Sequence, residues 1–549
     1  MRYLYSILIV IFGFSVAHAQ WDVKIDSIFL EFKDSPGCAV GVFKDGEIIF
    51  KKGYGIANLD YDIPITPTTV FDIGSVSKQF TAACIVILEN KGKLSFDDDI
   101  RKFIPEIPEY AEGIVTIRHL LHHTSGLRDY LTLMYLSGLS FDDYFTEEDG
   151  LSILTRQKEL NFQPGSEYLY SNSGYLALAI IVRRISGMSI GEFTSKHIFE
   201  PLGMKNSLVY EDGSAVIKNR AIGYAKNGEE FIREHHFDFV LGGDGQVYTT
   251  VEDFFKWNEN FKSNQLGNET FMEKLLTRGV LLNGDTLDYA LGIGHRNYRG
   301  HSAIGHGGAW GGFRADYMNF QEQDLAIVVM SNLGSANPGQ KVSQVAGLFL
   351  EDKSESMAPE SKLDVARKAT IKEIPIDQMV GKYGIQAGMM ATVSVNNDSL
   401  TVLQSWDNVS FNIIRIEGNT FQVPGNESLD LTFSDLKDGH TQLLTVIQNG
   451  VEIASKRVQE MEIQEVELKD YEGDYFSEEL DVTYDLSVKD EILMVHIPGI
   501  GHVELAVYAP DQFLYQGNLI KFDRKNGAVS GFSLDAGRVT NLKFSKVLK

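Results

Sequence analysis

Ser75 and Lys78 are the first residues whose types and spacing point to chemistry, within the segment FDIGSVSKQF (residues 71–80). If a helix begins at Val76, their side chains lie one turn apart on the same face and can touch. A serine hydroxyl becomes a good nucleophile only when a base removes its proton, and a lysine amine can act as that base only when it is uncharged. Burial or a neighbouring cation would have to lower the lysine pKa. The alternative is structural, with Ser75 capping the helix and Lys78 exposed in its first turn.

Two further motifs hold residue types that an acyl-transfer site needs. Tyr170 and Asn172 fall in the turn-rich segment QPGSEYLYSNSGY, ahead of an apolar helical pattern. His306 and Gly308 fall in GHGGAWGG, next to a predicted strand. An acyl-transfer site combines a nucleophile, a proton shuttle and backbone N–H donors at the point where charge forms on oxygen. Taken alone, Tyr170 would more often be a core aromatic residue with a hydrogen-bonded hydroxyl.

The order S-x-x-K, Y-x-N and H-x-G resembles the three-motif signature of the penicillin-binding-protein and serine β-lactamase superfamily. The tyrosine and histidine variants look like the class C β-lactamase-related serine hydrolases, which include esterases, D-aminopeptidases and D,D-peptidases. The resemblance extends over roughly residues 25–350 and includes PGCAVGVFKDG, TIRHLLHHTSGL and GGDGQVYTTVEDFFKW. It implies an α/β (α+β) domain, with an antiparallel sheet flanked by helices, an all-helical subdomain and a site in the cleft between them.

The same resemblance implies roles for the first two motifs. Ser75 would be the acylated nucleophile, and Lys78 its base or proton relay. Tyr170 would pass the proton to the leaving group. Asn172 would hold the substrate amide or orient Lys78. Neither a cofactor nor a metal ion is expected.

The third motif is expected to bind substrate through His306 and Gly308. The backbone N–H groups of Ser75 and Ala309 would form the oxyanion hole. His306 stands where β-lactamases typically have a lysine that helps to bind the β-lactam carboxylate, which argues against efficient β-lactam hydrolysis. A histidine at this position can donate a hydrogen bond and titrate near neutral pH.

The elements that must position these motifs are strands at both ends of a helical middle. The segment CAVGVFKDGEIIFKKGYG alternates apolar and polar residues around a Lys-Asp-Gly turn and predicts a β-hairpin. Residues 76–91 predict a buried helix, residues 100–257 indicate helices and loops, and strands return over residues 288–332. We expect one sheet in which the N- and C-terminal strands pair, with a helical insert beside it.

The C-terminal region has the sequence pattern of small β domains, with short alternating strands separated by Gly, Asn and Asp turns. The polar segment 353–374 predicts a linker after a hydrolase domain of residues 20–352. Beyond it, the pattern VGKYGI recurs as EGDYFS roughly ninety residues later. We predict two all-β barrels, residues 375–460 and 461–549, which resemble the lipocalin-like domains of some D-aminopeptidase-type proteins. The alternative to two barrels is one large sheet domain made of both halves. Two roles are open for the barrels: one of their loops covers the cleft and narrows the substrate range, or they serve only as a stabilising or docking module.

Length, charge and the N-terminus narrow the function classes. The 549 residues exceed what one hydrophobic core usually organises. The formal net charge of −25 repels nucleic acids and anionic membranes, so neither partner is expected. The stretch MRYLYSILIVIFGFSVAHAQ predicts a signal peptide, residues 1–19, cleaved after Ala19, and hence a periplasmic or secreted protein. An uncleaved anchor is the alternative, and no later segment is long enough to span a membrane.

Cysteines and histidines leave two points open. Cys38 and Cys84 are too few for a disulfide scaffold and are interpreted as core residues, with a single bridge as the alternative. A zinc site can be imagined from two histidine clusters, His119, His122 and His123, and His235 and His236. Because no neighbouring pattern supplies a convincing further ligand and an open position, no metal is predicted.

Together these patterns predict a secreted serine hydrolase that forms a Ser75 acyl-enzyme on an amide or ester. Cell-wall peptides containing D-residues and small esters are the expected substrates. A β-lactamase or D,D-carboxypeptidase is one alternative. A catalytically silent peptidoglycan-binding protein is another, and the intact Ser75, Lys78 and Tyr170 argue against it. The oligomeric state and any barrel ligand stay open.

Overall fold

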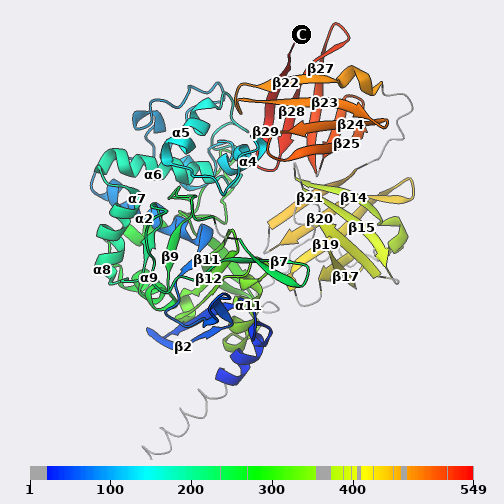
Figure 1. Cartoon of the computed structure of the whole chain (residues 1–549). Coiled ribbons are helices and arrows are strands. Elements are labelled where there is room, and N and C mark those ends of the chain that lie inside the picture. Colours follow the sequence, from blue (N-terminus) through cyan, green and yellow to red (C-terminus); the bar gives the residue numbers. More distant parts are fainter. Residues whose placement is uncertain are drawn as a thin grey trace, which may run out of the picture.

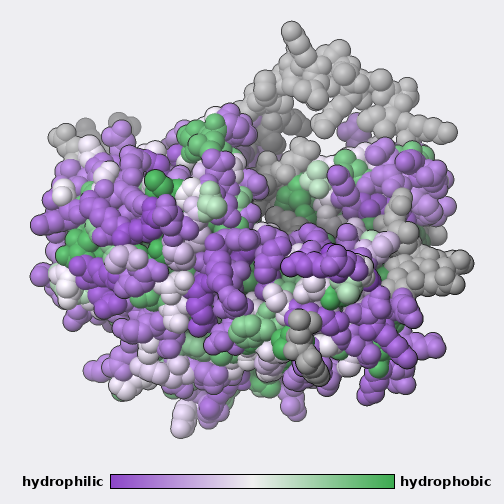
Figure 2. All heavy atoms as spheres, turned by 90° about the horizontal axis from the view of Figure 1, so that it is seen from above, coloured by the Kyte–Doolittle hydropathy of each residue, from purple (hydrophilic) through white to green (hydrophobic). Residues whose placement is uncertain are grey.

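The computed structural model describes residues 21–353 except 235 and 269, residues 373–458 apart from 387–388, 397–398, 405–409, 424–425 and 449–450, and residues 467–547 except 516. The predicted signal peptide, residues 1–19, and most of the predicted linker, residues 353–374, lie outside the described residues. No helix among the described residues is both long and apolar enough to cross a membrane. Figure 1 shows a mixed helix and sheet domain followed by two barrels, and the face seen in Figure 2 is mostly hydrophilic.

The N-terminal domain is built on a six-stranded antiparallel sheet with the order β10-β11-β12-β13-β1-β2. Its strands are β1 (Cys38–Lys44), β2 (Glu47–Tyr54), β10 (Gly294–Tyr298), β11 (His301–Trp310), β12 (Phe313–Phe320) and β13 (Leu325–Ser331). β1 pairs with β13, from Cys38 opposite Ser331 to Lys44 opposite Leu325. The prediction that N- and C-terminal strands pair in one sheet is therefore confirmed.

Helices cover both faces of this sheet (Figure 1). On one face, α11 (Pro338–Phe349) and the helical residues 21–28 share a core with Val40 and Val42 of β1. The alternate residues Ala39 and Phe43 face the larger helical region, as the two-residue period of a strand requires. The helices of that region are α2 (Lys78–Asn90), α3 (Ile117–Leu121), α4 (Tyr130–Leu136), α5 (Glu147–Arg156), α6 (Asn172–Ser186), α7 (Ile190–Thr194), α8 (Glu200–Leu202), α9 (Val251–Ser263) and α10 (Phe271–Leu275).

The predicted buried helix begins slightly later than its expected start at Val76. A 3-10 turn, η2 (Gly74–Ser77), leads into α2, whose residues 78–88 are all buried. Small and apolar side chains occupy nearly every face of this helix, so it can pass through the core. α2 therefore carries Lys78 into the interior of the molecule.

The two cysteines lie in different cores. Cys38 packs under α11, whereas Cys84 belongs to the core of the helical region on the other face of the sheet. Both thiols are free and buried, and burial raises the pKa of each to about 12. The interpretation as core residues holds, and the alternative of a bridge is wrong because the sheet separates the two thiols.

The C-terminal region forms two separate closed antiparallel barrels, which confirms the predicted pair and overturns the alternative of one large sheet. The first contains β14 (Gly381–Gln386), β15 (Met389–Asn396), β16 (Ser399–Gln404), β17 (Ser410–Glu417), β18 (Thr420–Val423), β19 (Asn426–Lys437), β20 (His440–Gln448) and β21 (Val451–Val458). The second contains β22 (Gly473–Ser477), β23 (Val482–Lys489), β24 (Ile492–Ile497), β25 (Gly501–Ala509), β26 (Gln512–Tyr515), β27 (Asn518–Lys525), β28 (Ala528–Ala536) and β29 (Val539–Lys546). Closure leaves no free sheet edges.

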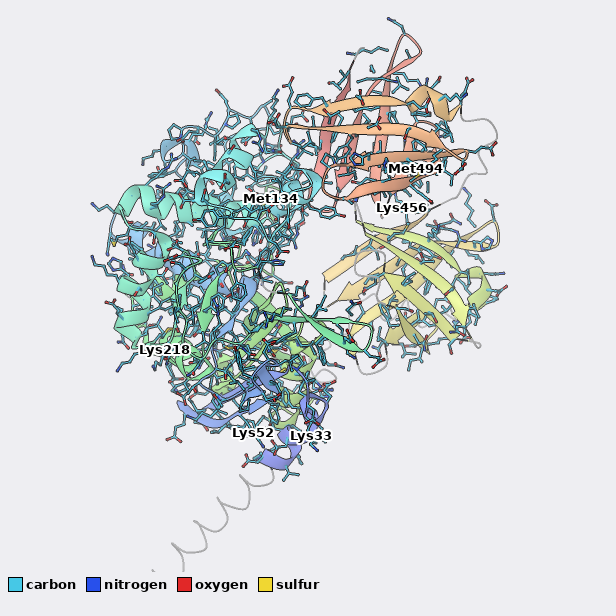
Figure 3. All side chains as sticks on the ribbon, in the orientation of Figure 1. Lys33, Lys52, Met134, Lys218, Lys456 and Met494 are labelled. Carbon is cyan, nitrogen blue, oxygen red and sulfur yellow. The ribbon has the colours of Figure 1, made fainter. Side chains whose placement is uncertain are left out.

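The second barrel is docked tightly on the helical region, next to α4 and α5 (Figure 1). Its apolar core is continuous with the core of that region, whereas the core of the first barrel is separate. Met134 of α4, labelled in Figure 3, is fully buried on the side of the helical region that faces the second barrel. The hydroxyl of Tyr484 in β23 donates to the Leu136 carbonyl oxygen at 2.6 Å.

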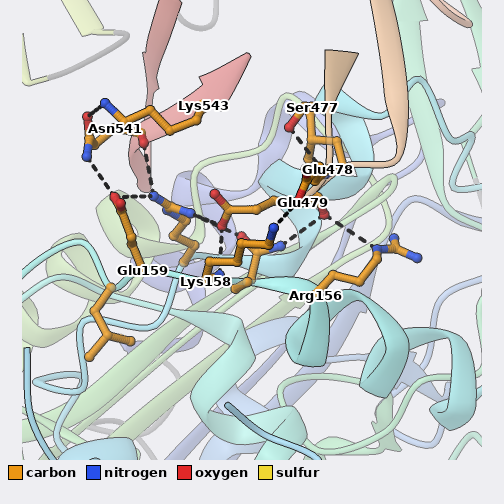
Figure 4. A network of polar contacts seen from close by, with 12 residues as sticks. Arg156, Lys158, Glu159, Ser477, Glu478, Glu479, Asn541 and Lys543 are labelled. Atoms are coloured by element: carbon orange, nitrogen blue, oxygen red, sulfur yellow. Dashed lines mark hydrogen bonds and ion pairs between the residues drawn. The ribbon is translucent and has the colours of Figure 1, made fainter. Parts of the chain in front are cut away.

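An ion pair is buried in this interface. Arg128 of the helical region pairs with Glu479 of the second barrel, and their side chains are 0% and 4% exposed. The neighbouring Glu478 pairs with Lys158 at the surface, where both side chains are more than half exposed. Figure 4 shows Glu478 and Glu479 next to Lys158 of the helical region. A buried charge without a partner is costly, so Glu479 and Arg128 depend on each other.

We predict that Glu479→Gln lowers the free energy of unfolding by about 3 kcal/mol, because the buried Arg128 charge then keeps only the more distant and partly exposed carboxylate of Glu159, at 3.8 Å. Glu478→Gln is the matched control and should leave the stability unchanged, since its pair is exposed and screened. Urea denaturation of both variants measures the difference. Equal urea midpoints for the two variants would contradict the importance of the buried pair.

Candidate active site

Ser75 lies where the short strand β5 (Phe71–Asp72) meets η2, at the start of α2. Asp72 holds the preceding turn, since its Oδ1 accepts a hydrogen bond from the Gly74 N–H at 2.7 Å. Gly74 has a φ of +50°, a conformation that glycine adopts most readily. The turn presents the partly buried Ser75 side chain to a cleft.

Lys78 is fully buried one turn later, and its amine has three acceptors. Nζ donates to Ser75 Oγ at 3.1 Å, to Asn172 Oδ1 at 2.9 Å and to the Asp244 carbonyl oxygen at 2.7 Å. These acceptors match the three donors of a charged lysine. When the amine is neutral, two N–H groups can stay on Asn172 and Asp244, so the lone pair turns to Ser75. The alternative of an exposed first-turn lysine is therefore wrong.

The surroundings of Lys78 make its neutral form more common than in an exposed lysine. Burial lowers the pKa of Lys78 to about 8, because little water reaches its charged form. The Asp244 carboxylate opposes this shift, and Arg538 adds to it. Burial also raises the pKa of Asp244 above its ordinary range, against the influence of Lys78. With a pKa of about 8, roughly one Lys78 amine in ten is neutral at pH 7.

The second motif faces this pair from the loop before α6. Asn172 begins the helix, and its N–H donates to Asp129 Oδ2 at 2.7 Å. Two cations lie near the Tyr170 ring, with Lys78 Nζ 4.9 Å and Arg538 Cζ 4.8 Å from its centroid. Burial raises the pKa of Tyr170, and the nearby Ser75 side chain lowers it in part. The Tyr170 hydroxyl is buried beside the Ser75 side chain and forms no well-aligned hydrogen bond to a described residue.

The third motif brings the edge of β11 against the turn at Ser75. A Cβ atom added to Gly74 would lie 2.6 Å from the Ala309 nitrogen. A Cβ atom added to Gly308 would lie 1.9 Å from the Ile73 carbonyl oxygen and 3.1 Å from the Ser75 nitrogen. Only glycine allows backbones to approach this closely. The two glycines thus place the backbone nitrogens of Ser75 and Ala309 at the same end of the cleft.

A chain of hydrogen bonds through His123 and Tyr289 holds the His306 ring in place. The Ser171 N–H donates to His123 Nδ1 at 3.1 Å, so the proton of the neutral His123 ring lies on Nε2, which contacts the Tyr289 hydroxyl at 3.1 Å. That hydroxyl then donates to His306 Nε2 at 3.0 Å, and His306 Nδ1 donates to the Gly307 carbonyl oxygen at 2.6 Å. The chain uses both nitrogens of each ring and has no place for an additional proton.

The expectation that His306 titrates near neutral pH is wrong. The residue is 8% exposed, and burial lowers its pKa to about 3. His123 is buried as well, and its pKa is lowered well below the ordinary value for the same reason. His306 lines the cleft as a neutral ring and brings no positive charge to the third motif.

The histidines of the imagined zinc site are engaged in other contacts. His119 accepts a hydrogen bond from the Thr116 N–H and helps to cap α3, and both ring nitrogens of His122 contact backbone carbonyl oxygens. His235 lies outside the described residues. Within the described part of the chain, no three His, Cys, Asp or Glu side chains are grouped to hold a metal ion.

Sequence reasoning missed several residues that shape the site: Asp129, Asp244, Tyr289, His123 and Arg538. His123 stood in the H-x-x-H-H run, but a metal was the only role considered for it. Asp244 contacts Lys78 through its backbone carbonyl oxygen, which no side-chain pattern reveals. The segment GGDGQVY around it was a usable signal.

These groups converge on one cleft of about 1090 Å³. The helical region contributes Tyr170 and Asn172, and the sheet contributes His306 and Gly308. Arg538 enters from the second barrel. The structure therefore brings the residues predicted from the three motifs together at a cleft between helices and sheet, as the resemblance implies, with Lys78 buried behind Ser75.

The sequence profile of the Beta-lactamase family matches residues 25–347, more than half of the chain. The chain belongs to the Beta-lactamase family. This match confirms the expected kinship with the serine β-lactamases and penicillin-binding proteins, a group of serine hydrolases. It covers the sheet, the helical region and all three motifs.

Two curated relatives carry different activities in their names. The chain is 30% identical over 302 residues to a D-aminopeptidase from Gluconobacter oxydans, an alignment that covers 55% of this chain and 56% of that enzyme. It is 28% identical over 368 residues to penicillin-binding protein 4* from Bacillus subtilis, covering 65% of this chain and 81% of that protein. The chain thus spans only about half the length of the first relative.

A solved structure extends the likeness of fold into the barrels. The octameric penicillin-binding protein homologue from Pyrococcus abyssi has a TM-score of 0.55 and 22% sequence identity. The superposition covers 88% of this chain and 99% of that one. At this identity the likeness concerns the fold alone.

We predict that Gly308→Ala lowers the turnover of an activated ester about 10²- to 10³-fold, the effect expected when one oxyanion donor is lost. The new Cβ would meet the Ile73 backbone and push β11 away from Ser75. Gly307→Ala is the matched control. The atom nearest to its new Cβ would be Asp316 Oδ2, at 3.2 Å, which belongs to a side chain and not to the backbone. Equal activity of the two variants would contradict the assigned backbone contact.

Proposed function

We propose that the protein is a serine hydrolase that cleaves an amide or ester through a Ser75 acyl-enzyme. Peptides containing D-residues and small esters are the proposed substrates. The observation that carries the proposal is the buried Lys78 amine, 3.1 Å from Ser75 Oγ and with a pKa lowered to about 8. The names of the two curated relatives, a D-aminopeptidase and a penicillin-binding protein, support this class of substrate.

In the acylation step, Ser75 Oγ attacks the carbonyl carbon while its proton moves to the lone pair of the neutral Lys78. The carbonyl oxygen becomes negatively charged and accepts hydrogen bonds from the backbone N–H groups of Ser75 and Ala309. Asn172 and the Asp244 carbonyl oxygen hold the other hydrogens of the amine, which keeps the lone pair aimed at Ser75. Proximity of this kind supplies a large part of the rate acceleration.

Breaking the C–N or C–O bond requires a proton on the leaving atom. Tyr170 is suited to supply it, because burial keeps its phenol protonated and its hydroxyl has no well-aligned partner among the described residues. Lys78, whose amine lies over the same ring, returns a proton to Tyr170. Water then attacks the acyl-enzyme and gives its proton to the neutral Lys78 amine. Lys78 passes this proton to Ser75 Oγ as the bond to the acyl group breaks, which restores the free serine and the neutral amine.

Two alternatives are less well supported by the site. A β-lactamase would use a positive charge at the third motif, whereas His306 is neutral. A silent binding protein would have no reason to bury Lys78 against Ser75, since an unused buried amine costs stability.

The proposal predicts that a fluorophosphonate adds one adduct to the wild-type protein and none to Ser75→Ala. This reagent phosphonylates a serine hydroxyl that has been activated as a nucleophile. Intact-mass spectrometry after exposure measures the adduct, and turnover of a panel of esters, D-aminoacyl amides and cephalosporins identifies the preferred bond. A wild-type protein that gains no mass and turns over none of the panel refutes the proposed activity.

A further inference from the structure

His123, in the loop after α3, holds the chain on both sides of Tyr170. The backbone N–H of Leu169 donates to the His123 carbonyl oxygen at 3.0 Å, and the backbone N–H of Ser171 donates to His123 Nδ1 at 3.1 Å. The rings of His123 and Tyr170 are packed together, with their centroids 4.1 Å apart. His123 therefore contacts the residue before Tyr170, the residue after it and the aromatic ring itself.

The backbone of His123 adopts an unusual conformation. Its φ is +57°, in the left-handed region that residues other than glycine rarely adopt. The side chain is buried as well, with an exposed fraction of 1%. A residue in such a conformation persists only where its surroundings fix it, and such residues are concentrated at functional sites. The conformation thus points to a role for His123 in the site beside it.

The Tyr289 hydroxyl joins the His123 ring to the third motif. Both ends of this chain of hydrogen bonds are backbone groups, whose roles as donor or acceptor cannot change. The Ser171 N–H can only donate, so the proton of the neutral His123 ring lies on Nε2. The Gly307 carbonyl oxygen can only accept, so the His306 proton lies on Nδ1 and its Nε2 accepts. A hydroxyl fits between the two rings, because it accepts from one and donates to the other.

Removing this hydroxyl would leave both rings without a partner on Nε2. The N–H of His123 and the bare nitrogen of His306 would then be buried and unsatisfied, which is costly. Tyr175, whose ring packs against His123 and whose hydroxyl lies near that of Tyr289, gives its proton to the Leu121 carbonyl oxygen at 2.9 Å. The Tyr289 hydroxyl is therefore the group that keeps the His123 ring in its orientation against Tyr170.

We propose that His123 is a positioning residue for Tyr170, and that the Tyr289 hydroxyl holds the His123 ring in this role. The inference rests on the proposed function, in which Tyr170 gives a proton to the leaving group. That transfer requires the phenol to stay aimed at the leaving atom. His123 restricts the phenol through the chain on both sides of it and through the contact between the rings.

A pair of esters with the same acyl group tests the proposal, because they differ in how much the leaving group needs a proton. Methoxide leaves a methyl ester only with a proton, whereas p-nitrophenolate departs without one. In Tyr289→Phe, we expect kcat/KM for the methyl ester of N-acetyl-D-alanine to fall about tenfold more than kcat/KM for the p-nitrophenyl ester.

Tyr317→Phe is the matched control, and it should keep the wild-type ratio of the two esters. Tyr317 lies opposite His306 on β12, is fully buried and donates its hydroxyl to Asn258 Oδ1 at 2.7 Å. The control therefore also loses a buried hydroxyl from a hydrogen bond, but at a place with no contact to the His123 ring.

Histidine ¹⁵N chemical shifts test the hydrogen-bond arrangement without any turnover. They show which ring nitrogen carries the proton, and the signals missing from His123→Gln and from His306→Gln identify the two residues. In the wild type at pH 7, the proton of His123 should lie on Nε2 and that of His306 on Nδ1. Any other arrangement, or a charged ring, overturns the inference.

The kinetic outcomes separate this inference from the proposed function. An equal fall for both esters in Tyr289→Phe, or the same change of their ratio in Tyr317→Phe, overturns the inference. If Tyr170→Phe slows mainly the methyl ester and Tyr289→Phe does not, the inference alone is wrong. If Tyr170→Phe slows both esters equally, the proton transfer of the proposed function is refuted, and the inference fails with it.

Discussion

A lysine amine with no access to water is the constraint on which the rest of the site depends. Burying such a group is costly unless each of its donors finds an acceptor. The acceptors of Lys78 come from three segments, and Asn172 and Asp244 are 94 and 166 positions away in the sequence. The helical region must fold around α2 to bring them together. The same burial that demands these partners lowers the lysine pKa and so prepares the amine to act as a base.

The other parts of the molecule supply what this base needs. The contact between Gly74 and Gly308 joins the sheet to the start of α2 and sets two backbone nitrogens beside Ser75. The second barrel is held by the buried pair of Arg128 and Glu479, and the same docked face delivers Arg538 to the cleft. The sequence left two roles open for the barrels: a loop that covers the cleft, or a module that only stabilises or docks. The second barrel fits the first role, because its turn at Arg538 reaches the cleft. The first barrel, with its separate core, has no such contact within the described part of the chain.

Local patterns predicted the elements and the motif residues, because hydrophobic periodicity and short motifs are local properties of the chain. The pairing of β1 with β13, the buried α2 and the two barrels all followed from such patterns. Arg538 did not, since nothing near it in the sequence indicates that its turn packs against Asp129 and Asn161. His306 was predicted to titrate because its type suggests so, but its pKa depends on burial and on Tyr289, which the sequence does not specify.

The most direct test of the central claim is the pKa of Lys78 itself. In protein labelled with ¹³C in its lysine side chains, the Cε signal that is missing from Lys78→Arg identifies the residue, and its chemical shift is followed against pH. A titration near pH 8 is the result that a buried, proton-accepting amine predicts. A titration at about 10.4, the value of an ordinary exposed lysine, would contradict it, because Lys78 would then be almost entirely charged at pH 7.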